Sequence, residues 1–543
     1  MSSPGTRMAV ALRRSALAAL LLGALVAGCG DSDEPSPARG GTLVIDANYG
    51  QLSTLDPHSL SPTVSLYINH ARFTTLLTFD GSDTRDPRPA LAESYEASPD
   101  AKVFTFQLRD DATFADGTPI TSEDVVFSLN RVLHFELGTQ VGPAMFPGKV
   151  TFEADGPSTV IMRSEKPAPF TPAVMTTPQM SIINAKLAKA HGANDTGKKD
   201  TASPWLTSGD SGDTSSGPYK LSSFVANKEI VLTRNAEYWG APAAYDRIVI
   251  RNVAAPAQLL QVQRGKSELA LDVGATEVAR LKGNDRVSVS STPSANLLLF
   301  FLNNDPKIST VTSNAKLREA VRYAIDYDRI VELAGEGAAQ ATGIFPRSYH
   351  GSLGADQAID QDLDRAKQAY AESGASEPFT LYYGTDSAVA GVQTSIIAQS
   401  VKSDLDAAGI EAKIVGAPIS TVFQKAFIQH ELDASFFPTW PVIPNVDEIG
   451  RWVPGGHENL TAMAGYPDDA DVELRELADR ALSATSVEER VALFEDVQLQ
   501  LNERGPWVPL VNPAQVFVST RSVALPEYHP IWIVDLADVQ PAD

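Results

Sequence analysis

The stretch that decides the fold is PALAESYEASPDAKVFTFQLRDDATFADGTPITSEDVVFSLNRVL, residues 89–133. Inside it, residues 103–109 alternate between apolar and polar side chains, and this period of two predicts a half-buried strand. The turn sequence DGTP follows at 116–119, and Thr121 then stands where a helix cap is expected. The apolar residues of the helix share one face: Val125, Leu129, Val132 and Leu133. The segment therefore combines a strand and a helix joined by a turn.

The second half of the chain continues the same mixed pattern. Strands are expected at three places, 379–383, 410–415 and 432–437. A helix between the first two ends at Gly409, and its apolar face is expected to hold Val392, Ile396, Ile397, Val401, Leu405 and Ala408. Strands that alternate with helices predict a sheet with helical crossovers, and so an α/β fold.

Three further elements frame this pattern. Leu43 to Ile45 reads as a strand that follows two glycines. Residues 297–302 (LLLFFL) are uniformly apolar, as expected of a strand that is buried on both faces. A helix opens with a capping box at 486–489 and ends near 505–506. Residues 192–217, rich in Gly, Ser, Thr and Asp, are expected to form a loop outside the core.

Composition limits the class of protein. The chain has 543 residues, of which 43% are hydrophobic, so more than one domain with a real core is expected. The single cysteine, Cys29, excludes an internal disulfide. Lys plus Arg number 44 and Asp plus Glu 67, a net charge of -23, which disfavours a nucleic-acid partner because it repels phosphate backbones.

The first residues predict export and anchoring. Arg7, Arg13 and Arg14 precede a short apolar run that ends at Cys29, the pattern of a signal peptide rather than of a membrane-spanning helix. The sequence VAGC at 26–29 resembles the bacterial lipobox. That resemblance implies cleavage before Cys29 and lipid attachment to its thiol, which would hold the protein on the outer side of the cell membrane.

Local motifs for catalysis or metal binding are missing from the sequence. It contains no G-x-S-x-G elbow and no H-E-x-x-H, and no two of its eight histidines stand three to five residues apart. We expect these histidines on the surface or in loops. With Cys29 assigned to lipidation, no thiol nucleophile remains. No catalytic residue, metal or cofactor is therefore expected.

Seven segments carry a resemblance to a known family, in that family's order. They are 40–44 (GGTLV), 53–57 (STLDP), 89–133, 216–221 (SGPYKL), 234–240 (RNAEYWG), 246–248 (DRI) and 317–346. Together they resemble the family 5 solute-binding proteins of ABC importers, the oligopeptide-, dipeptide- and nickel-binding type.

The resemblance implies a two-lobed α/β fold of the periplasmic-binding-protein kind, joined by a hinge and with an extra subdomain in lobe I. The expected division is signal peptide 1–28, flexible tether 29–40, lobe I 41–79, inserted subdomain of lobe I 80–204, lobe I again 205–290, lobe II 291–507 and the C-terminal part of lobe I 508–543.

It also implies a function. An extracytoplasmic lipoprotein would capture a peptide or peptide-like organic solute between the lobes and deliver it, as a monomer, to ABC permease subunits with their ATPases. Two alternatives remain. One is an exported ligand sensor or scaffold with the same fold, which a lone gene beside a sensor gene would favour. The other is an exported hydrolase, which would need a nucleophile or metal that the sequence does not show.

One segment departs from the family pattern. Peptide-binding members carry an aspartate after a Tyr-Pro pair, and that aspartate pairs with the ligand's ammonium group. Counted without gaps from Asp433, the chain has Asn445 at this place, preceded by Val442, Ile443 and Pro444. Asparagine carries no charge. Three alternatives follow: Asp447 substitutes for the missing acid, the ligand lacks a free ammonium group, or another acid holds it.

Other ligand-binding candidates are named on weaker grounds. Ser53 and Thr54 follow the first strand, where binding loops of open α/β sheets lie. Trp440 is displaced by one residue from the family's tryptophan, and it could stack on a ligand or serve the core. Arg451 could bind a ligand carboxylate through a bidentate fork.

Overall fold

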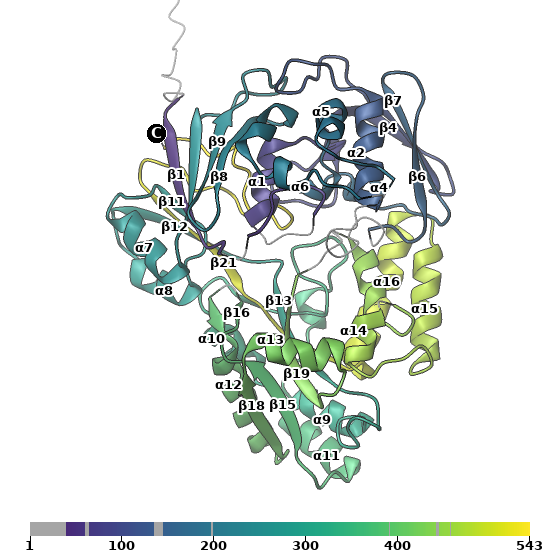
Figure 1. Ribbon diagram of the computed structural model, residues 1–543. Helices are drawn as coiled ribbons and strands as arrows, with labels where there is room; N and C mark the ends of the chain where they lie inside the picture. The colour runs from purple at the N-terminus through teal and green to yellow at the C-terminus, as the bar shows by residue number, and fades with distance from the viewer. Residues whose placement is uncertain are drawn as a thin grey trace, which may run out of the picture. The chain divides into compact units, whose positions relative to one another are not determined.

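The computed structural model describes residues 40–50, 52–59, 64–134, 145–196, 199–389, 391–440, 445–456 and 458–542 (Figure 1). Cys29, the leader, the tether up to residue 39, and Val442, Ile443 and Pro444 lie outside these residues. Within the described ranges, no helix is both long and apolar enough to cross a bilayer.

A seven-stranded sheet contains the first strand of the chain. Its order is β12 (Val287–Pro293), β21 (Ala514–Thr520), β11 (Leu269–Ala270), β1 (Thr42–Ala47), β10 (Arg247–Asn252), β9 (Glu229–Arg234) and β8 (Tyr219–Val225). Strand β1 pairs in parallel with both β10 and β11. The helices associated with these strands are α1 (Val64–Arg72), α7 (Ala255–Gln263) and α8 (Ala275–Leu281). The strand predicted at residues 43–45 is confirmed as part of β1.

The deciding stretch, residues 89–133, supplies two strands of a separate four-stranded sheet. Strands β4 (Ala92–Ala97), β5 (Val103–Leu108), β7 (Thr159–Ser164) and β6 (Val150–Ala154) pair antiparallel in that order. The predicted strand is β5, and its Phe104, Phe106 and Leu108 are buried. The predicted helix is α2 (Ser122–His134), whose Val125, Leu129 and Val132 are buried in the same cluster. Small elements nearby are β2 (Leu77–Thr78), β3 (Arg88–Pro89), α4 (Thr171–Val174), α5 (Ala185–Ala190) and α6 (Ser203–Leu206).

A six-stranded sheet is built from the second half of the chain. Its order is β14 (Ala339–Gln340), β20 (Trp507–Asn512), β13 (Leu297–Leu302), β19 (Ala434–Thr439), β15 (Phe379–Gly384) and β18 (Ala412–Ala417). Strand β15 runs parallel to β18 and β19, whereas β13 runs antiparallel to both of its neighbours. All six residues of β13 are fully buried, which confirms the strand predicted at 297–302.

The helices of this half of the chain are α9 (Ala315–Ala324), α10 (Tyr327–Ala334), α11 (Leu363–Ser373), α12 (Thr394–Ala407), α13 (Ile419–Phe423), α14 (Glu458–Met463), α15 (Val472–Ser483) and α16 (Val487–Arg504). Among them, α10, α12, α13 and α16 pack against strands of the sheet. Ser486 caps α16, which is one half of the capping box predicted at 486–489, because its Oγ accepts a hydrogen bond from the Glu489 backbone N–H at 3.2 Å. The predicted face of α12 is partly wrong. Val392 lies in the short hairpin strand β17 (Val392–Gln393), and Ile396 is 48% exposed, because the buried stripe follows Ile397, Val401 and Leu405.

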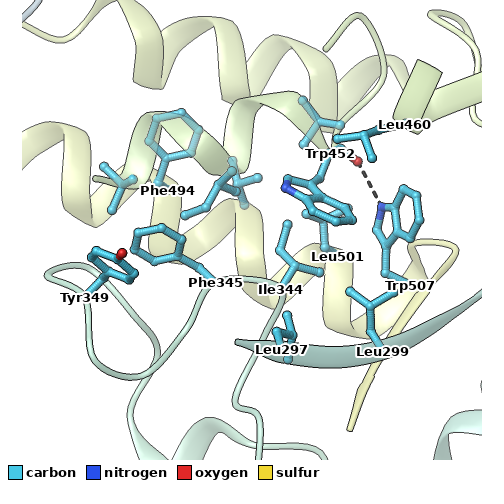
Figure 2. Packing of buried hydrophobic residues seen from close by; sticks show 14 of the residues in the cluster. Leu297, Leu299, Ile344, Phe345, Tyr349, Trp452, Leu460, Phe494, Leu501 and Trp507 are labelled. Carbon is cyan, nitrogen blue, oxygen red and sulfur yellow. Dashed lines mark hydrogen bonds between the residues drawn. The ribbon is translucent and has the colours of Figure 1, made fainter. Parts of the chain in front are cut away.

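The largest apolar cluster surrounds two tryptophans. Trp452 and Trp507 meet edge to face with ring centroids 4.9 Å apart, and Trp507 Nε1 donates a hydrogen bond to the Trp452 carbonyl at 3.0 Å (Figure 2). Figure 2 shows Phe345 and Phe494 on the same cluster, together with Leu299 of β13. Trp452 is 3% exposed, so it serves the core.

The prediction for residues 192–217 is wrong, because this segment is packed into the fold. It forms α6 and a 3-10 turn (Gly209–Thr214), and Ser211, Thr214 and Ser215 are fully buried. Ser211 Oγ donates to the Ser208 carbonyl at 2.8 Å, and Thr214 Oγ1 donates to the Ser211 carbonyl at 2.6 Å. Short hydroxyl side chains that bond to their own backbone can be buried without apolar content.

His58 and His529 lie in loops, as the surface-or-loop expectation allows, but both are buried, at 2% and 4% exposed. His58 sits in a charged network around Arg131, whose guanidinium binds the Asp56 and Asp200 carboxylates at 2.7 Å each. Arg131 also donates to His58 Nδ1 at 2.9 Å. Burial and the Arg131 charge lower the pKa of His58 to about 4, so the ring is neutral and accepts this bond.

Candidate functional site

The carboxyl ends of parallel strands define the first half of the candidate site. In open α/β sheets, ligands bind beyond these ends. In the seven-stranded sheet they are the ends of β1, β10 and β11, and the residues found there are Asn48, Asn252 and Asp272. We call these three residues the seven-strand edge. Tyr49 N donates to Asn252 Oδ1 at 2.9 Å, which joins the ends of β1 and β10.

The loop after β1 holds Ser53 and Thr54, as predicted. Ser53 is exposed. Thr54 is engaged in structural hydrogen bonds, because its hydroxyl bonds to Ser203 Oγ and Thr207 Oγ1, each at 3.0 Å. These bonds tie the loop to helix α6.

The second half of the site is formed by the carboxyl ends of β15, β18 and β19 in the other sheet. We call this the six-strand edge. Trp440 follows β19 directly and is 57% exposed, a large apolar area for a residue beside a core. Asp386 follows β15 and is exposed, and its Oδ1 accepts from the Ile419 backbone N–H at 2.7 Å.

Asn445 comes five residues after Trp440 in the sequence and is buried, with 1% of its surface exposed. It caps the 3-10 turn Val446–Arg451, since its Oδ1 accepts from the Asp447 backbone N–H at 2.9 Å. Its Nδ2 has no hydrogen-bond partner among the described residues. The carbonyl oxygen is thus in use, and what the side chain still offers is a donor.

Asp447 is engaged by the protein itself. Arg490 Nη1 binds its two carboxylate oxygens at 3.1 and 3.0 Å, and Arg490 is fully buried. Arg490 Nη2 in turn donates to the carbonyls of Pro167, Leu482 and Ala484. Burial raises the pKa of Asp447, and the neighbouring arginine opposes that rise. A ligand ammonium group would therefore have to compete with Arg490 for this acid.

Arg451 is also paired within its own turn. Its Nη1 binds the Glu448 carboxylate at 3.1 and 3.2 Å, while its Nε has no partner among the described residues. Glu448 is 5% exposed, and the Arg451 side chain is 20% exposed. A ligand carboxylate could reach the guanidinium only beside this existing pair.

The two edges come together at a pair of glycines. Gly391 lies on the connection from β15 to α12 and Gly274 follows β11, and a Cβ added to Gly391 would meet Gly274 Cα at 2.9 Å. The backbone of Gly391 has a φ of +84°, which favours glycine. A second link is made by Tyr349, whose hydroxyl donates to the Pro530 carbonyl at 3.0 Å. Loops connected to the two sheets are thus in direct contact.

The chemistry of these edges is that of reversible binding. They offer amides, carboxylates and an exposed indole, which form hydrogen bonds, ion pairs and stacking contacts. In the described part of the chain, no group of three or more His, Cys, Asp or Glu side chains is arranged to hold a metal ion. Asp272 was missed from the sequence. A search for acids directly after each expected strand would have found it, had residues 269–271 been recognised as a strand.

Comparison with known proteins identifies the class. The family model for bacterial extracellular solute-binding proteins, family 5 Middle, matches residues 86–457. Among solved structures, a binding protein named CtaP from Listeria monocytogenes superposes with a TM-score of 0.79 at 20% identity, covering 93% of this chain and 100% of that one. The ABC transporter-associated periplasmic binding protein DppA from Helicobacter pylori, in complex with the peptide STSA, gives a TM-score of 0.74 at 20% identity, over 93% of this chain and 99% of that one.

These matches define the fold as that of two-lobed α/β periplasmic binding proteins. The chain belongs to family 5 of the bacterial extracellular solute-binding proteins.

Curated relatives are consistent with this membership. The probable D,D-dipeptide-binding periplasmic protein DdpA of Escherichia coli is 30% identical over 341 residues, which span 60% of this chain and 62% of that protein. The glutathione-binding protein GsiB of Shigella dysenteriae is 25% identical over 97% of this chain and 98% of its own length. Family 5 proteins bind solutes outside the cytoplasm, and these relatives are binding proteins rather than enzymes.

Proposed function

We propose that this protein is the extracytoplasmic binding component of an ABC importer, capturing a peptide or peptide-like organic solute between two lobes and delivering it to a membrane permease. The observation that carries the proposal is the meeting of the two strand-end edges at Gly274 and Gly391. A solute that lies between such edges is enclosed when they close, which is a hinge motion rather than a reaction.

The solute class is supported by the relatives. Their names cite a D,D-dipeptide, glutathione and di- or tripeptides. Haem is also named for one relative, so a peptide is the favoured solute within a wider range. Among the predicted contact residues, Trp440 is exposed, whereas Asn445 is buried and offers an Nδ2 that has no hydrogen-bond partner among the described residues. Ser53 remains a predicted contact that rests only on its position after β1. Thr54, Asp447 and Arg451 are weaker candidates, because each already forms hydrogen bonds or an ion pair within the protein.

The lobe boundaries stay part of the proposal. We take lobe I as 41–79, 205–290 and 508–543 with the inserted subdomain 80–204, and lobe II as 291–507. Strand β20 (Trp507–Asn512) pairs with β13 of the six-stranded sheet, which supports moving the last boundary a few residues towards the C-terminus.

Peptide capture is tested on the purified protein with a mixed library of di- to tetrapeptides. After incubation and desalting, retained peptides are identified by mass spectrometry. We expect a subset of peptides to be retained without cleavage. Retention of none, or release of hydrolysed products, would refute the proposal in favour of another solute or of an enzyme.

Closure is tested with two glycine variants of matched backbone strain. Gly391→Ala and Gly409→Ala both place a Cβ at a positive φ, +84° and +77°, at a cost of about 1–2 kcal/mol each. Only the first brings that Cβ against the other edge, since nothing lies within 4 Å of the second. We expect Gly391→Ala alone to weaken affinity for a retained peptide, measured by isothermal titration calorimetry. Equal affinity in the two variants would show that closure does not involve this contact.

The anchor at Cys29 and the permease partner are proposed from the leader sequence and the family. A Cys29→Ser variant expressed in a bacterial host is expected to leave the membrane fraction for the soluble extracytoplasmic fraction. If it stays in the membrane fraction after a high-salt wash, the lipid-anchor proposal fails.

A further inference from the structure

We propose that Asp272 binds the cationic group of the captured solute, such as a peptide's amino terminus, from the seven-strand edge. This inference rests on the proposed function and supplies the acid that the position of Asn445 lacks.

The Asp272 side chain is held in place by neutral donors. Its Oδ2 accepts from the Asn48 backbone N–H at 2.7 Å and from Gln258 Nε2 at 3.1 Å. Gln258 is fully buried, and its Oε1 accepts from the Asp272 backbone N–H at 3.0 Å. Such a reciprocal pair fixes the carboxylate before a ligand arrives, which lowers the cost of binding.

No cation compensates this carboxylate within the described residues. The buried acids Asp46, Asp56 and Asp447 each have an arginine partner, namely Arg251, Arg131 and Arg490. Asp272 forms no such pair, and its Oδ1 accepts no hydrogen bond from the described part of the chain. Burial raises its pKa above the ordinary value of 3.8, as expected of an acid whose charge lacks a partner. A ligand cation would provide that partner.

The location of Asp272 fits a ligand contact. It stands two residues past the end of β11, next to Asn48 at the end of β1, and so at the edge where open sheets bind ligands. Gly274, two residues further on, touches Gly391 of the opposite edge. A solute enclosed where the edges meet would therefore lie close to Asp272.

Three acids of the second half of the chain are poorer candidates. Asp447 is bound by Arg490, and Glu448 is bound by Arg451. Asp386 pairs with no arginine in the described ranges, but it is exposed, so water screens its charge. A partly desolvated carboxylate forms the stronger charge-assisted hydrogen bond. The missing acid at position 445 left three alternatives: replacement by Asp447, a ligand without a free ammonium group, or recognition by another acid. The structure favours the third.

The test compares free and N-acetylated peptides. Wild type, Asp272→Asn and Asp386→Asn are each incubated with an equimolar mixture of the di- to tetrapeptide library and its N-acetylated counterpart. Retained peptides are counted by mass spectrometry. Wild type and Asp386→Asn are expected to enrich free amines by roughly tenfold or more, the range for a hydrogen bond to a charged group. Asp272→Asn is expected to show an enrichment near one while still retaining acetylated peptides.

Three outcomes would overturn the inference. One is a preference for free amines that survives in Asp272→Asn, another is its loss in Asp386→Asn instead, and the third is a wild type without any preference. The proposed function stands in all three, because peptides are still bound. If the wild type retains neither library, peptide capture fails and the inference fails with it.

A second variant separates charge from structure. Asp272→Glu keeps the negative charge but lengthens the side chain, so it disturbs the bonds to Asn48 and Gln258 more than Asp272→Asn does. If charge is what counts, Asp272→Glu keeps a measurable preference for free amines and Asp272→Asn does not. The reverse order would assign Asp272 a purely structural role.

Discussion

Asp447 and Asp272 lie in the two halves of the chain that supply the two large sheets, and burial raises the pKa of both. Their partners differ. Asp447 is bound by fully buried Arg490, which also holds three backbone carbonyls, whereas Asp272 is held by a backbone N–H and the amide of Gln258. The first pair is closed within the protein, whereas no cation among the described residues pairs with the second acid. Residue type and burial alone therefore do not tell a structural acid from a binding one.

The largest effect should come from breaking the closed pair. Arg490→Met leaves Asp447 buried without its cation, and we expect the free energy of unfolding to fall by about 3–5 kcal/mol. Urea denaturation measures this. The control is Arg280→Met, which breaks an exposed pair with Glu277 and should cost roughly 0.2–1 kcal/mol. Similar losses in both variants would contradict the distinction.

Asn445→Asp would place an acid at the position where the family pattern has one. Aspartate caps a turn as well as asparagine does, but at 1% exposure its charge would lack a cation, so we expect a loss of about 1–3 kcal/mol. In the double variant with Asp272→Asn, this new acid should restore part of the preference for free amines. If the double variant stays without preference in the peptide competition, position 445 does not face the solute's amino group.

Asp272→Asn should change stability little and in a direction set by pH. Asparagine can keep accepting from Asn48 and Gln258, and it removes an uncompensated charge. Because the folded-state pKa of Asp272 is raised above 3.8, the folded state binds more protons than the unfolded state, so the acid costs stability as pH rises through that range. We expect the variant to be equal to wild type near pH 3 and more stable by up to ~1 kcal/mol at pH 7. Thermal unfolding across this range checks it, and a variant that is less stable at pH 7 would contradict it.

The smallest effect on stability is expected at Trp440. Its side chain is 57% exposed, so Trp440→Ala should change the free energy of unfolding by no more than about 0.5 kcal/mol. If the indole stacks on the solute, affinity for a retained peptide falls several-fold in calorimetry. An unchanged affinity would remove Trp440 from the site, and a large loss of stability would show that it belongs to the core.

The sequence predictions succeeded where the structure depends on a local sequence pattern. The strand at 103–108, helix α2, the buried strand at 297–302 and the capped helix α16 each depend on a repeat that neighbouring residues display. The prediction of a loop outside the core at 192–217 failed because the hydroxyls around Ser211 bond to their own backbone, so polar residues could be buried there. The burial of His58 in its loop depends instead on distant partners, because Arg131 and the Ser181 carbonyl bond to its ring.

The sequence by itself determined the family, the α/β class and most elements, since these depend on motifs and on periods of two and 3.6 residues. It also named Asn445 as the position where the usual acid is missing. Only the tertiary structure decided which acids are free. Ion pairs such as Asp447 with Arg490 join residues 43 apart in the sequence, and Asp272 meets Asn48 across 224 residues. Whether an acid is available to a ligand depends on such distant partners, and a local sequence pattern does not reveal them.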